Sequence, residues 1–213
     1  MKRNPRPQYW SESVTGASWE KLVALCGEVD VVVVGGWAVY LWTQAQKSKD
    51  IDVLVDYGVL TQLRDRYRVE RNERLHKYEV KLEGFDLDIY LPHYSKLAIP
   101  VEDLLREHVT KVQGIATVTP EALLALKQAA ELDRRGSSKG TKDVLDILNL
   151  LLDAPLDLQK YKVLLDRHRL GHLIPELITI LTDFDTRDLR YLGLNLKDFA
   201  HWRRALLVQL RAL

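Results

Sequence analysis

Two pairs of aspartates stand at alternate positions within apolar stretches of the chain. Asp50 and Asp52 lie on either side of an isoleucine, and Asp86 and Asp88 alternate with apolar residues in segment 85–91. Successive side chains of a β-strand point to opposite faces, so each pair is expected to share one face. Neighbouring carboxylates repel each other when ionised, and a cation relieves that repulsion. Oxygen ligands of this kind favour Mg2+ or Mn2+.

An isolated Asp-x-Asp motif is more often the solvent face of an amphipathic strand than a metal site. The residues upstream change this balance. Segment 29–34 is expected to form a buried strand, and Gly35 and Gly36 separate it from an apolar helix at 37–43. Glycine lets the backbone approach a phosphate closely, and a helix N-terminus offers it unpaired N–H groups. The combination predicts a site for a metal and a phosphorylated ligand.

The remaining pattern predicts an α+β fold, in which a mixed sheet flanked by helices precedes an all-helical C-terminal region. We expect a catalytic domain at 1–115 and a helical domain at 116–213 that completes the cleft. The expected strands are 51–55, 78–82, 85–91 and 115–118, with Glu83-Gly84 as a turn. The expected helices are 18–26, 101–108, Pro120 to about 135 with Thr119 as N-cap, 141–152 with Thr141 as N-cap, and two or three within 158–213.

Composition limits the classes of protein that fit the chain. Of the 213 residues, 46% are hydrophobic and 29% charged, which is ordinary for a folded protein. Lys and Arg number 31 against 30 Asp and Glu, so no global positive field marks a nucleic-acid binder. Cys26 is the only cysteine, which excludes an internal disulfide and a cysteine-based zinc site. No apolar run approaches the ~20 residues of a membrane span, and segment 1–10 lacks a signal-peptide core, so we expect a cytoplasmic protein without a membrane partner.

Three stretches together resemble the DNA polymerase beta superfamily of nucleotidyltransferases. They are VVVVGGWAVYLW, KDIDVLVD and FDLDIYLP. The resemblance implies that Asp50, Asp52 and Asp88 hold two metal ions, Mg2+ or Mn2+, and that Asp88 also activates or orients the attacking hydroxyl. Asp86 shares the face of Asp88 and is the alternative third acid. Among residues 46–49, Ser48 matches a hydroxyl residue of the family, whereas Lys47 stands in for the arginine that many relatives carry.

The stretch TPEALLALKQAAELDRRGSSKGTKDVLDILNLL resembles the helical region of the abortive-infection (AbiEii-like) toxin-type nucleotidyltransferases. This resemblance implies that Lys127 and Lys142 join Gly35, Gly36 and Ser48 in binding an NTP. It also implies an RNA or protein acceptor, and a cognate toxin or antitoxin protein as a partner.

Several of these residues also have a purely structural interpretation. Lys127 lies on an apolar helical face and either extends out of the core to solvent or reaches the triphosphate. Arg134, Arg135 and Asp143 are interpreted as favourable charges at helix ends. A cation at Lys142 opposes the helix dipole, which favours a phosphate partner. His168 and His172 are interpreted as surface residues rather than zinc ligands. The aromatics Tyr9, Trp10, Trp19, Trp37, Trp42 and Trp202 are interpreted as core residues, one of which is able to stack on a base.

The combined hypothesis is a metal-dependent enzyme that moves an NMP from an NTP to an acceptor hydroxyl and releases pyrophosphate. Two alternatives remain open at this stage. A carboxylate cluster also suits a metal-dependent phosphohydrolase or nuclease, because it does not specify the nucleophile. The helical half also suits a catalytically weak, antitoxin-like binding module.

Overall fold

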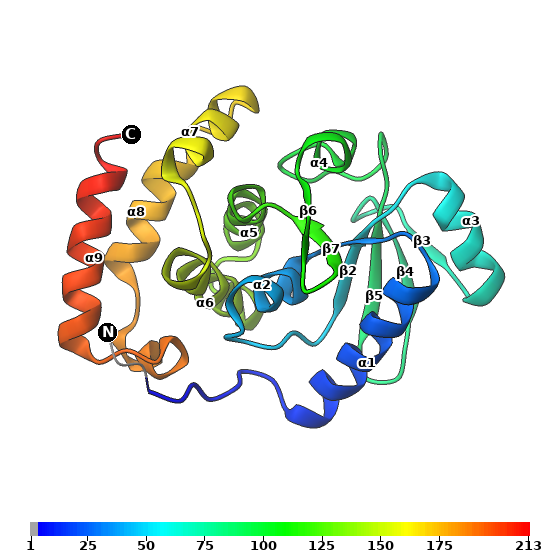
Figure 1. Cartoon of the computed structure of the whole chain (residues 1–213), viewed down its shortest axis with the longest axis horizontal. Coiled ribbons are helices and arrows are strands. Elements are labelled where there is room, and N and C mark those ends of the chain that lie inside the picture. Colours follow the sequence, from blue (N-terminus) through cyan, green and yellow to red (C-terminus); the bar gives the residue numbers. More distant parts are fainter. Residues whose placement is uncertain (1–3) are drawn as a thin grey trace.

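The computed structural model describes residues 4–213, which form one mixed β-sheet with helices against it and a helical region at one end (Figure 1). In this part of the chain the sheet has seven strands in the order β3-β4-β5-β2-β1-β7-β6. They are β1 Val32–Val34, β2 Ile51–Leu54, β3 Glu70–Asn72, β4 Lys77–Lys81, β5 Asp86–Tyr90, β6 Val109–Val112 and β7 Ile115–Val118. The expected mixed α and β architecture, with a helical C-terminal region, is confirmed.

The centre of the sheet is built from short apolar strands that are covered on both faces. β1 runs antiparallel to β2 and parallel to β7, and β2 runs parallel to β5. Val33, Val53 and Ile89 are fully buried there. β-branched side chains suit such a pleated, buried surface. The β4–β5 hairpin turns at Gly84, whose φ of 87° is a backbone conformation that favours glycine.

The helices complete the core on both sides of the sheet. α2 packs on β2 and also contacts α5 and α6, and the indole N–H of Trp37 donates to Ser18 Oγ of α1 at 2.8 Å. The helices are α1 Glu12–Glu28, α2 Gly35–Thr43, α3 Tyr57–Arg66, α4 Val101–Glu107, α5 Pro120–Arg134, α6 Ser138–Asp153, α7 Leu158–Arg167, α8 Leu173–Asp183, the 3-10 helix η1 Thr186–Leu192 and α9 Leu196–Leu210. Within the described residues, none of them combines the length and apolarity that a membrane crossing requires.

The N-terminal strap, residues 4–10, joins the helical region to the loop that follows α2 (Figure 1). Asn4 N–H donates to the carbonyl of Gly193 at 3.0 Å. The buried Gln46 amide donates to the carbonyls of Pro7 and Tyr191 and accepts from the Tyr9 N–H. The strap is therefore held by Gln46, which is 37 residues beyond Tyr9, and by Leu192, which accepts from Arg6 and is 186 residues beyond it.

Several features differ from the sequence prediction. β1 begins at Val32 rather than at residue 29, and α1 begins six residues earlier than predicted. α3, β3 and β6 were not predicted, because their polar composition gives weak periodicity. Thr119 is the N-cap residue of α5, but its side chain makes no capping bond. The prediction that Thr141 caps α6 is wrong, because Ser137 is the N-cap and its Oγ accepts from Gly140 N–H at 3.0 Å.

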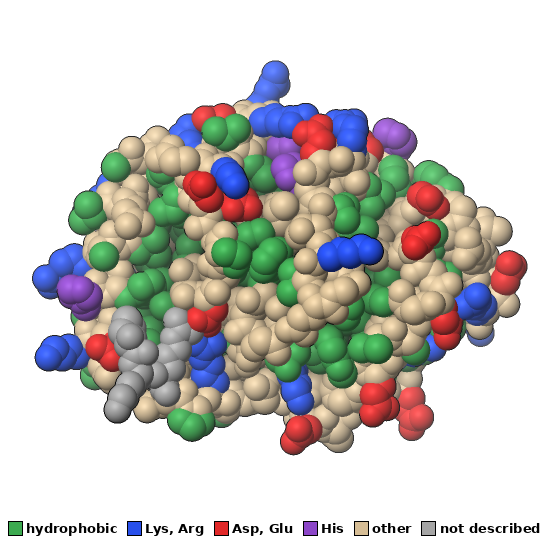
Figure 2. Space-filling view, viewed as in Figure 1, with side chains coloured by type: hydrophobic (Ala, Val, Ile, Leu, Met, Phe, Trp, Pro, Cys, Tyr) green, Lys and Arg blue, Asp and Glu red, His purple; other side chains and the backbone are tan. Residues whose placement is uncertain are grey.

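Both charge signs are dispersed over the surface of the molecule. Figure 2 shows Lys and Arg side chains interspersed with Asp and Glu on the face in view. This distribution agrees with the formal net charge of +1. It gives that face no single-sign field, so the local charges of a cleft decide what binds there.

The turn between α5 and α6 generates a stability prediction. A Cβ added at Gly140 would lie 2.5 Å from the Arg134 carbonyl oxygen, a backbone atom that cannot rotate away. We expect Gly140→Ala to lower the free energy of unfolding by about 1–3 kcal/mol, measured by urea denaturation. Gly171→Ala is the control, because nothing lies within 4 Å of its added Cβ. Equal effects of the two substitutions would contradict the close α5–α6 contact.

Candidate active site

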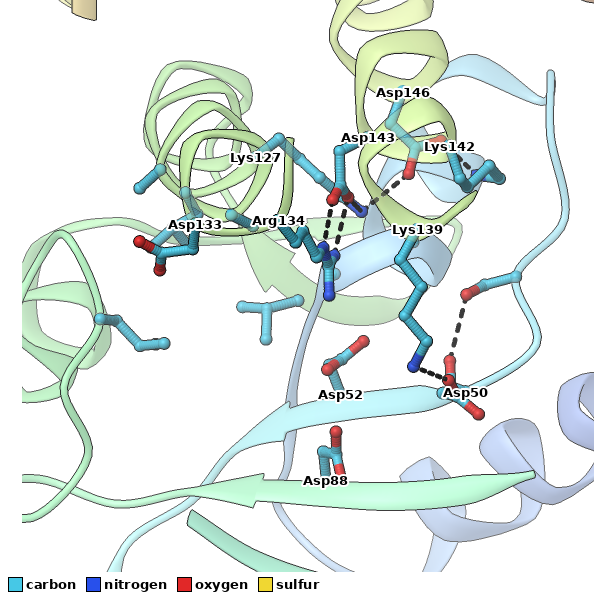
Figure 3. A pocket seen from close by; sticks show the side chains of 18 of the residues that line it. Asp50, Asp52, Asp88, Lys127, Asp133, Arg134, Lys139, Lys142, Asp143 and Asp146 are labelled. Carbon is cyan, nitrogen blue, oxygen red and sulfur yellow. Dashed lines mark hydrogen bonds and ion pairs between the residues drawn. The ribbon is translucent and has the colours of Figure 1, made fainter. Parts of the chain in front are cut away.

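Three aspartates lie together at the cleft face of the two central strands. Asp52 of β2 and Asp88 of β5 are register partners in the parallel pair, and Asp50 directly precedes β2. All three line one cleft, as Figure 3 shows. Asp86 lies outside the cleft lining, where its carboxylate pairs with Lys81 at 2.8 Å. The register therefore brings Asp88, and not Asp86, beside Asp52.

The glycine pair brings the start of α2 against these carboxylates. Gly35 has a φ of 67°, and a Cβ there would lie 2.1 Å from Asp52 Oδ2, so both backbone and space require glycine. A Cβ on Gly36 would lie 2.4 Å from Ser48 Oγ. The Ser48 hydroxyl in turn donates to the Asp50 carbonyl at 3.1 Å. The N-terminus of α2 thus opens into the cleft beside Asp52.

The cleft has a volume of about 540 Å³ and lies between the sheet and the α5–α6 hairpin. Its lining lacks the alternative third acid, Asp86, but includes the other residues that the sequence assigned to the site: Gly35, Gly36, Ser48, Asp50, Asp52, Asp88, Lys127 and Lys142. Of the tryptophans in residues 4–213, Trp10 of the strap is the one in the lining. Trp37 is fully buried, and the Trp42 indole donates to the Val118 carbonyl. Trp10 is therefore the tryptophan placed to contact a ligand.

A buried ion network links α5 and α6 at the roof of the cleft. Lys127 Nζ lies 3.1 Å from Asp143 Oδ1 and 2.7 Å from Asp146 Oδ2. Lys142 also pairs with Asp146, and Arg134 pairs with Asp143 through two bonds. Lys127 does not extend to solvent, because only 6% of its surface is exposed. Asp143 is likewise a buried partner of two cations, and the interpretation of it as a helix-end charge is wrong.

Three further cations line this cleft: Lys77 and Lys139, which the sequence did not single out, and Arg134, which it interpreted only as a helix-end charge. Lys139 of α6 reaches down to Asp50 Oδ2 at 3.1 Å, and Arg134 projects from the end of α5 toward the same carboxylates (Figure 3). Lys77 of β4 lies 2.5 Å from Asp88 Oδ2. Counting back across the Glu83-Gly84 turn pairs Glu79 with Asp88, and Lys77 lies two residues from Glu79 on the same strand face. Lys77 was therefore within reach of sequence analysis. The positions of Lys139 and Arg134 in the cleft depend on the turn between α5 and α6.

Burial and neighbouring negative charge raise the pKa values of Asp52 and Asp88. Burial, together with the charges of Asp88 and Asp50, raises the pKa of Asp52 to about 6, against the opposing effect of Lys127 and Lys77. Burial also raises the pKa of Asp88, although Lys77 opposes it. The Tyr90 hydroxyl donates to Asp52 Oδ1 at 3.3 Å, and burial and the two carboxylates hold its pKa above the usual range. The site is electrostatically crowded and suits a cation.

Two observations bear on whether a divalent metal fits this donor set. Across residues 4–213, no three His, Cys, Asp or Glu side chains are gathered closely enough to hold a metal as they stand. Lys139 and Lys77 pair with two of the three cleft carboxylates. However, the buried Oδ1 of Asp88 has no hydrogen-bond partner, and all the donors are hard oxygens. The chemistry of the residues therefore fits Mg2+ or Mn2+.

The other sequence candidates do not join the cleft. Arg135 pairs with Glu131 and Glu176 at the end of α5, as expected of a structural charge. His168 ends α7 and His172 precedes α8, so they do not form a ligand pair on one helix. The His168 ring instead faces His108, with 6.4 Å between ring centroids.

Comparison with known proteins identifies the fold. The solution structure of the antibiotic-resistance factor ANT(2'')-Ia has a TM-score of 0.56 at 16% identity, covering 78% of this chain and 97% of that one. Its crystal structure with adenylyl-2''-tobramycin has a TM-score of 0.50 at 16% identity, covering 75% and 98%. JHP933 from Helicobacter pylori has a TM-score of 0.52 at 14% identity, covering 95% of both chains. No protein-family model and no curated protein sequence matches the chain. The chain has a nucleotidyltransferase-type fold.

The raised pKa of Asp52 generates a pH-dependent prediction. Because the folded-state pKa of about 6 exceeds the ordinary 3.8, ionised Asp52 destabilises the folded protein as pH rises through that interval. In EDTA, Asp52→Asn is expected to raise the melting temperature at about pH 8, with the gain disappearing near pH 4. Asp86→Asn, which alters an ion-paired carboxylate outside the cleft, is the control and should give no gain. A pH-independent effect of Asp52→Asn would contradict the assignment.

The buried network generates a second prediction. Lys127→Met leaves Asp143 and Asp146 with one cation each, and removing one partner of a buried ion pair costs about 3–5 kcal/mol. Urea denaturation of the variant is expected to show a loss of this size. Lys162→Met breaks the more exposed pair with Asp166 on α7, and its loss should stay below about 1 kcal/mol. If both variants lose the same small amount, the network does not stabilise the α5–α6 hairpin.

Proposed function

We propose that this protein is a metal-dependent nucleotidyltransferase that joins an NMP from an NTP to an acceptor hydroxyl. The observation that carries the proposal is the position of Asp50, Asp52 and Asp88 in one cleft, facing cationic side chains and the glycine-lined start of α2. The carboxylates suit a metal, and the opposite wall suits a triphosphate. The shared fold of ANT(2'')-Ia, whose crystal structure contains adenylyl-2''-tobramycin, supports the same reaction class.

In this proposal the acceptor oxygen attacks the α-phosphorus of the NTP, and the bond between the α- and β-phosphates breaks. Pyrophosphate leaves, and the hydroxyl proton passes to Asp88. The raised pKa of Asp88 makes it a better proton acceptor than an ordinary aspartate. Asp50, Asp52 and Asp88 would hold Mg2+ or Mn2+, which when bound offsets the charge of the triphosphate.

Phosphate binding is proposed for one side of the cleft. The N–H groups at Gly35 and Gly36 and the hydroxyl of Ser48 are available there. Lys127 and Lys142 are proposed to supply positive potential from behind their carboxylate partners, rather than by extending freely into the cleft. Lys139 and Arg134 are more exposed, and we add them as direct phosphate contacts.

The finer assignments belong to the same proposal. We propose an AbiEii-like subtype with an RNA or protein acceptor, a cognate toxin or antitoxin partner and a cytoplasmic location. We also propose a catalytic domain at 1–115 and a helical domain at 116–213, joined through β7. The complex of ANT(2'')-Ia with adenylyl-2''-tobramycin supports nucleotidyl transfer over the hydrolytic alternative.

A labelling experiment tests the proposed function. The protein is incubated with Mg2+ or Mn2+, each α-labelled NTP, total RNA and cell lysate, and covalent labelling is measured together with pyrophosphate release. We expect one class of acceptor to be labelled, and Asp52→Asn to reduce labelling by at least about 100-fold. Asp86→Asn, on the same strand face as Asp88 but outside the cleft, should retain activity. Release of free NMP without a labelled acceptor would instead identify a hydrolase.

A further inference from the structure

We propose that Lys77 is a positioning residue that fixes the orientation of Asp88, so that one carboxylate oxygen is held and the other is presented to the acceptor. The inference rests on the proposed function, because it assigns Asp88 a role toward the attacking hydroxyl. No feature of the nucleotidyltransferase resemblance singles out Lys77. Its assignment follows from the register of the β4–β5 hairpin and from the contacts that its ammonium makes.

The two oxygens of Asp88 differ in their surroundings. Oδ2 lies 2.5 Å from Lys77 Nζ, whereas Oδ1 is buried and has no hydrogen-bond partner. A buried carboxylate oxygen without a donor is costly unless a ligand completes it. The ion pair therefore fixes which oxygen is left for the reaction.

Lys77 is itself held in place. Only 9% of its surface is exposed although it lines the cleft, and its Nζ lies 3.3 Å from Glu79 Oε2 on the same strand face. Glu79 is the register partner of Asp88 across the hairpin, and Asn72 of β3 donates to Glu79. Residues of three adjacent strands thus place the ammonium between two carboxylates. A flexible surface lysine would have no such fixed position.

The same hairpin contains a matched control. Lys81 lies on the same face of β4, and its Nζ pairs with Asp86 at 2.8 Å and with Glu79 at 3.4 Å. Like Lys77, Lys81 is a lysine of β4 that pairs with carboxylates. Unlike Lys77, it is largely exposed and lies outside the cleft lining. A general charge-balancing role in the sheet would make Lys77 and Lys81 equivalent.

The test compares Lys77→Met, Lys77→Arg and Lys81→Met with two independent readouts. The first is the dissociation constant for Mn2+ alone, measured by electron paramagnetic resonance of the free ion. The second is kcat and KM for the NTP and RNA or lysate mixture that the wild-type protein labels. Melting temperatures and circular dichroism establish that each variant is folded.

For Lys77→Met we expect opposite changes in the two readouts. Removing the cation from Asp88 should tighten Mn2+ binding by roughly fivefold. Loss of the charged hydrogen bond should lower kcat by about tenfold or more while KM for NTP changes little. A partly unfolded variant would instead lose both Mn2+ affinity and kcat. Lys77→Arg, which keeps a cationic donor, should recover most of kcat, and Lys81→Met should match the wild type in both readouts.

The proposal is overturned if folded Lys77→Met keeps the wild-type kcat, or if Lys77→Met and Lys81→Met change Mn2+ affinity equally. Failure of the proposed function gives a different result. In that case the wild-type protein labels no acceptor, whereas the Mn2+ measurement still decides whether the charge of Lys77 acts on the carboxylates. Glu79→Gln combined with Lys77→Met supplies a charge-balanced variant, and it should restore neither the orientation of Asp88 nor kcat.

Discussion

The structure must accommodate three carboxylates, those of Asp50, Asp52 and Asp88, beside one another at the parallel strands β2 and β5. Asp52 and Asp88 are register partners, so the sheet itself forces their charges together. Burial of like charges disfavours ionisation of both. Three neighbouring elements each supply a cation that faces these carboxylates: Lys77 from β4, Lys127 from α5 and Lys139 from α6. The negative charges of the cleft are therefore balanced by cations from several elements, none of which supplies all of them.

The helical region takes part in this balance and is not an appended unit. Asp143 and Asp146 hold Lys127, and Lys127 in turn acts on the pKa of Asp52 across the cleft. Lys127 belongs to α5, whereas the two carboxylates that hold it belong to α6. The cation that opposes the raised pKa of Asp52 is therefore held by contacts between both helices of the α5–α6 hairpin, and the geometry of such buried polar contacts is restrictive.

Sequence analysis located the carboxylates because strand alternation is a local pattern, readable within five residues. It left Asp86 and Asp88 as alternatives, since both share a face and only the register with Asp52 separates them. It placed Lys127 on the right helix but missed its carboxylate partners. Those contacts depend on the turn at Gly136 to Gly140, where Ser137 rather than Thr141 caps α6. Interactions across such turns have no periodic signature.

The N-terminal strap has a consequence for the order in which the molecule is built. Pro7 and Tyr9 are bonded to Gln46, which also donates to the carbonyl of Tyr191, and Asn4 is bonded to Gly193. A growing chain leaves the ribosome from its N-terminus, so Asn4 acquires its partner only after Gly193 has been synthesised, whereas Gln46 is available to Pro7 and Tyr9 much earlier. Trp10, the last residue of the strap, lines the cleft. Trp10 therefore lines the cleft from the end of a strap whose bond to Gly193 forms only after α5 to η1 have been synthesised.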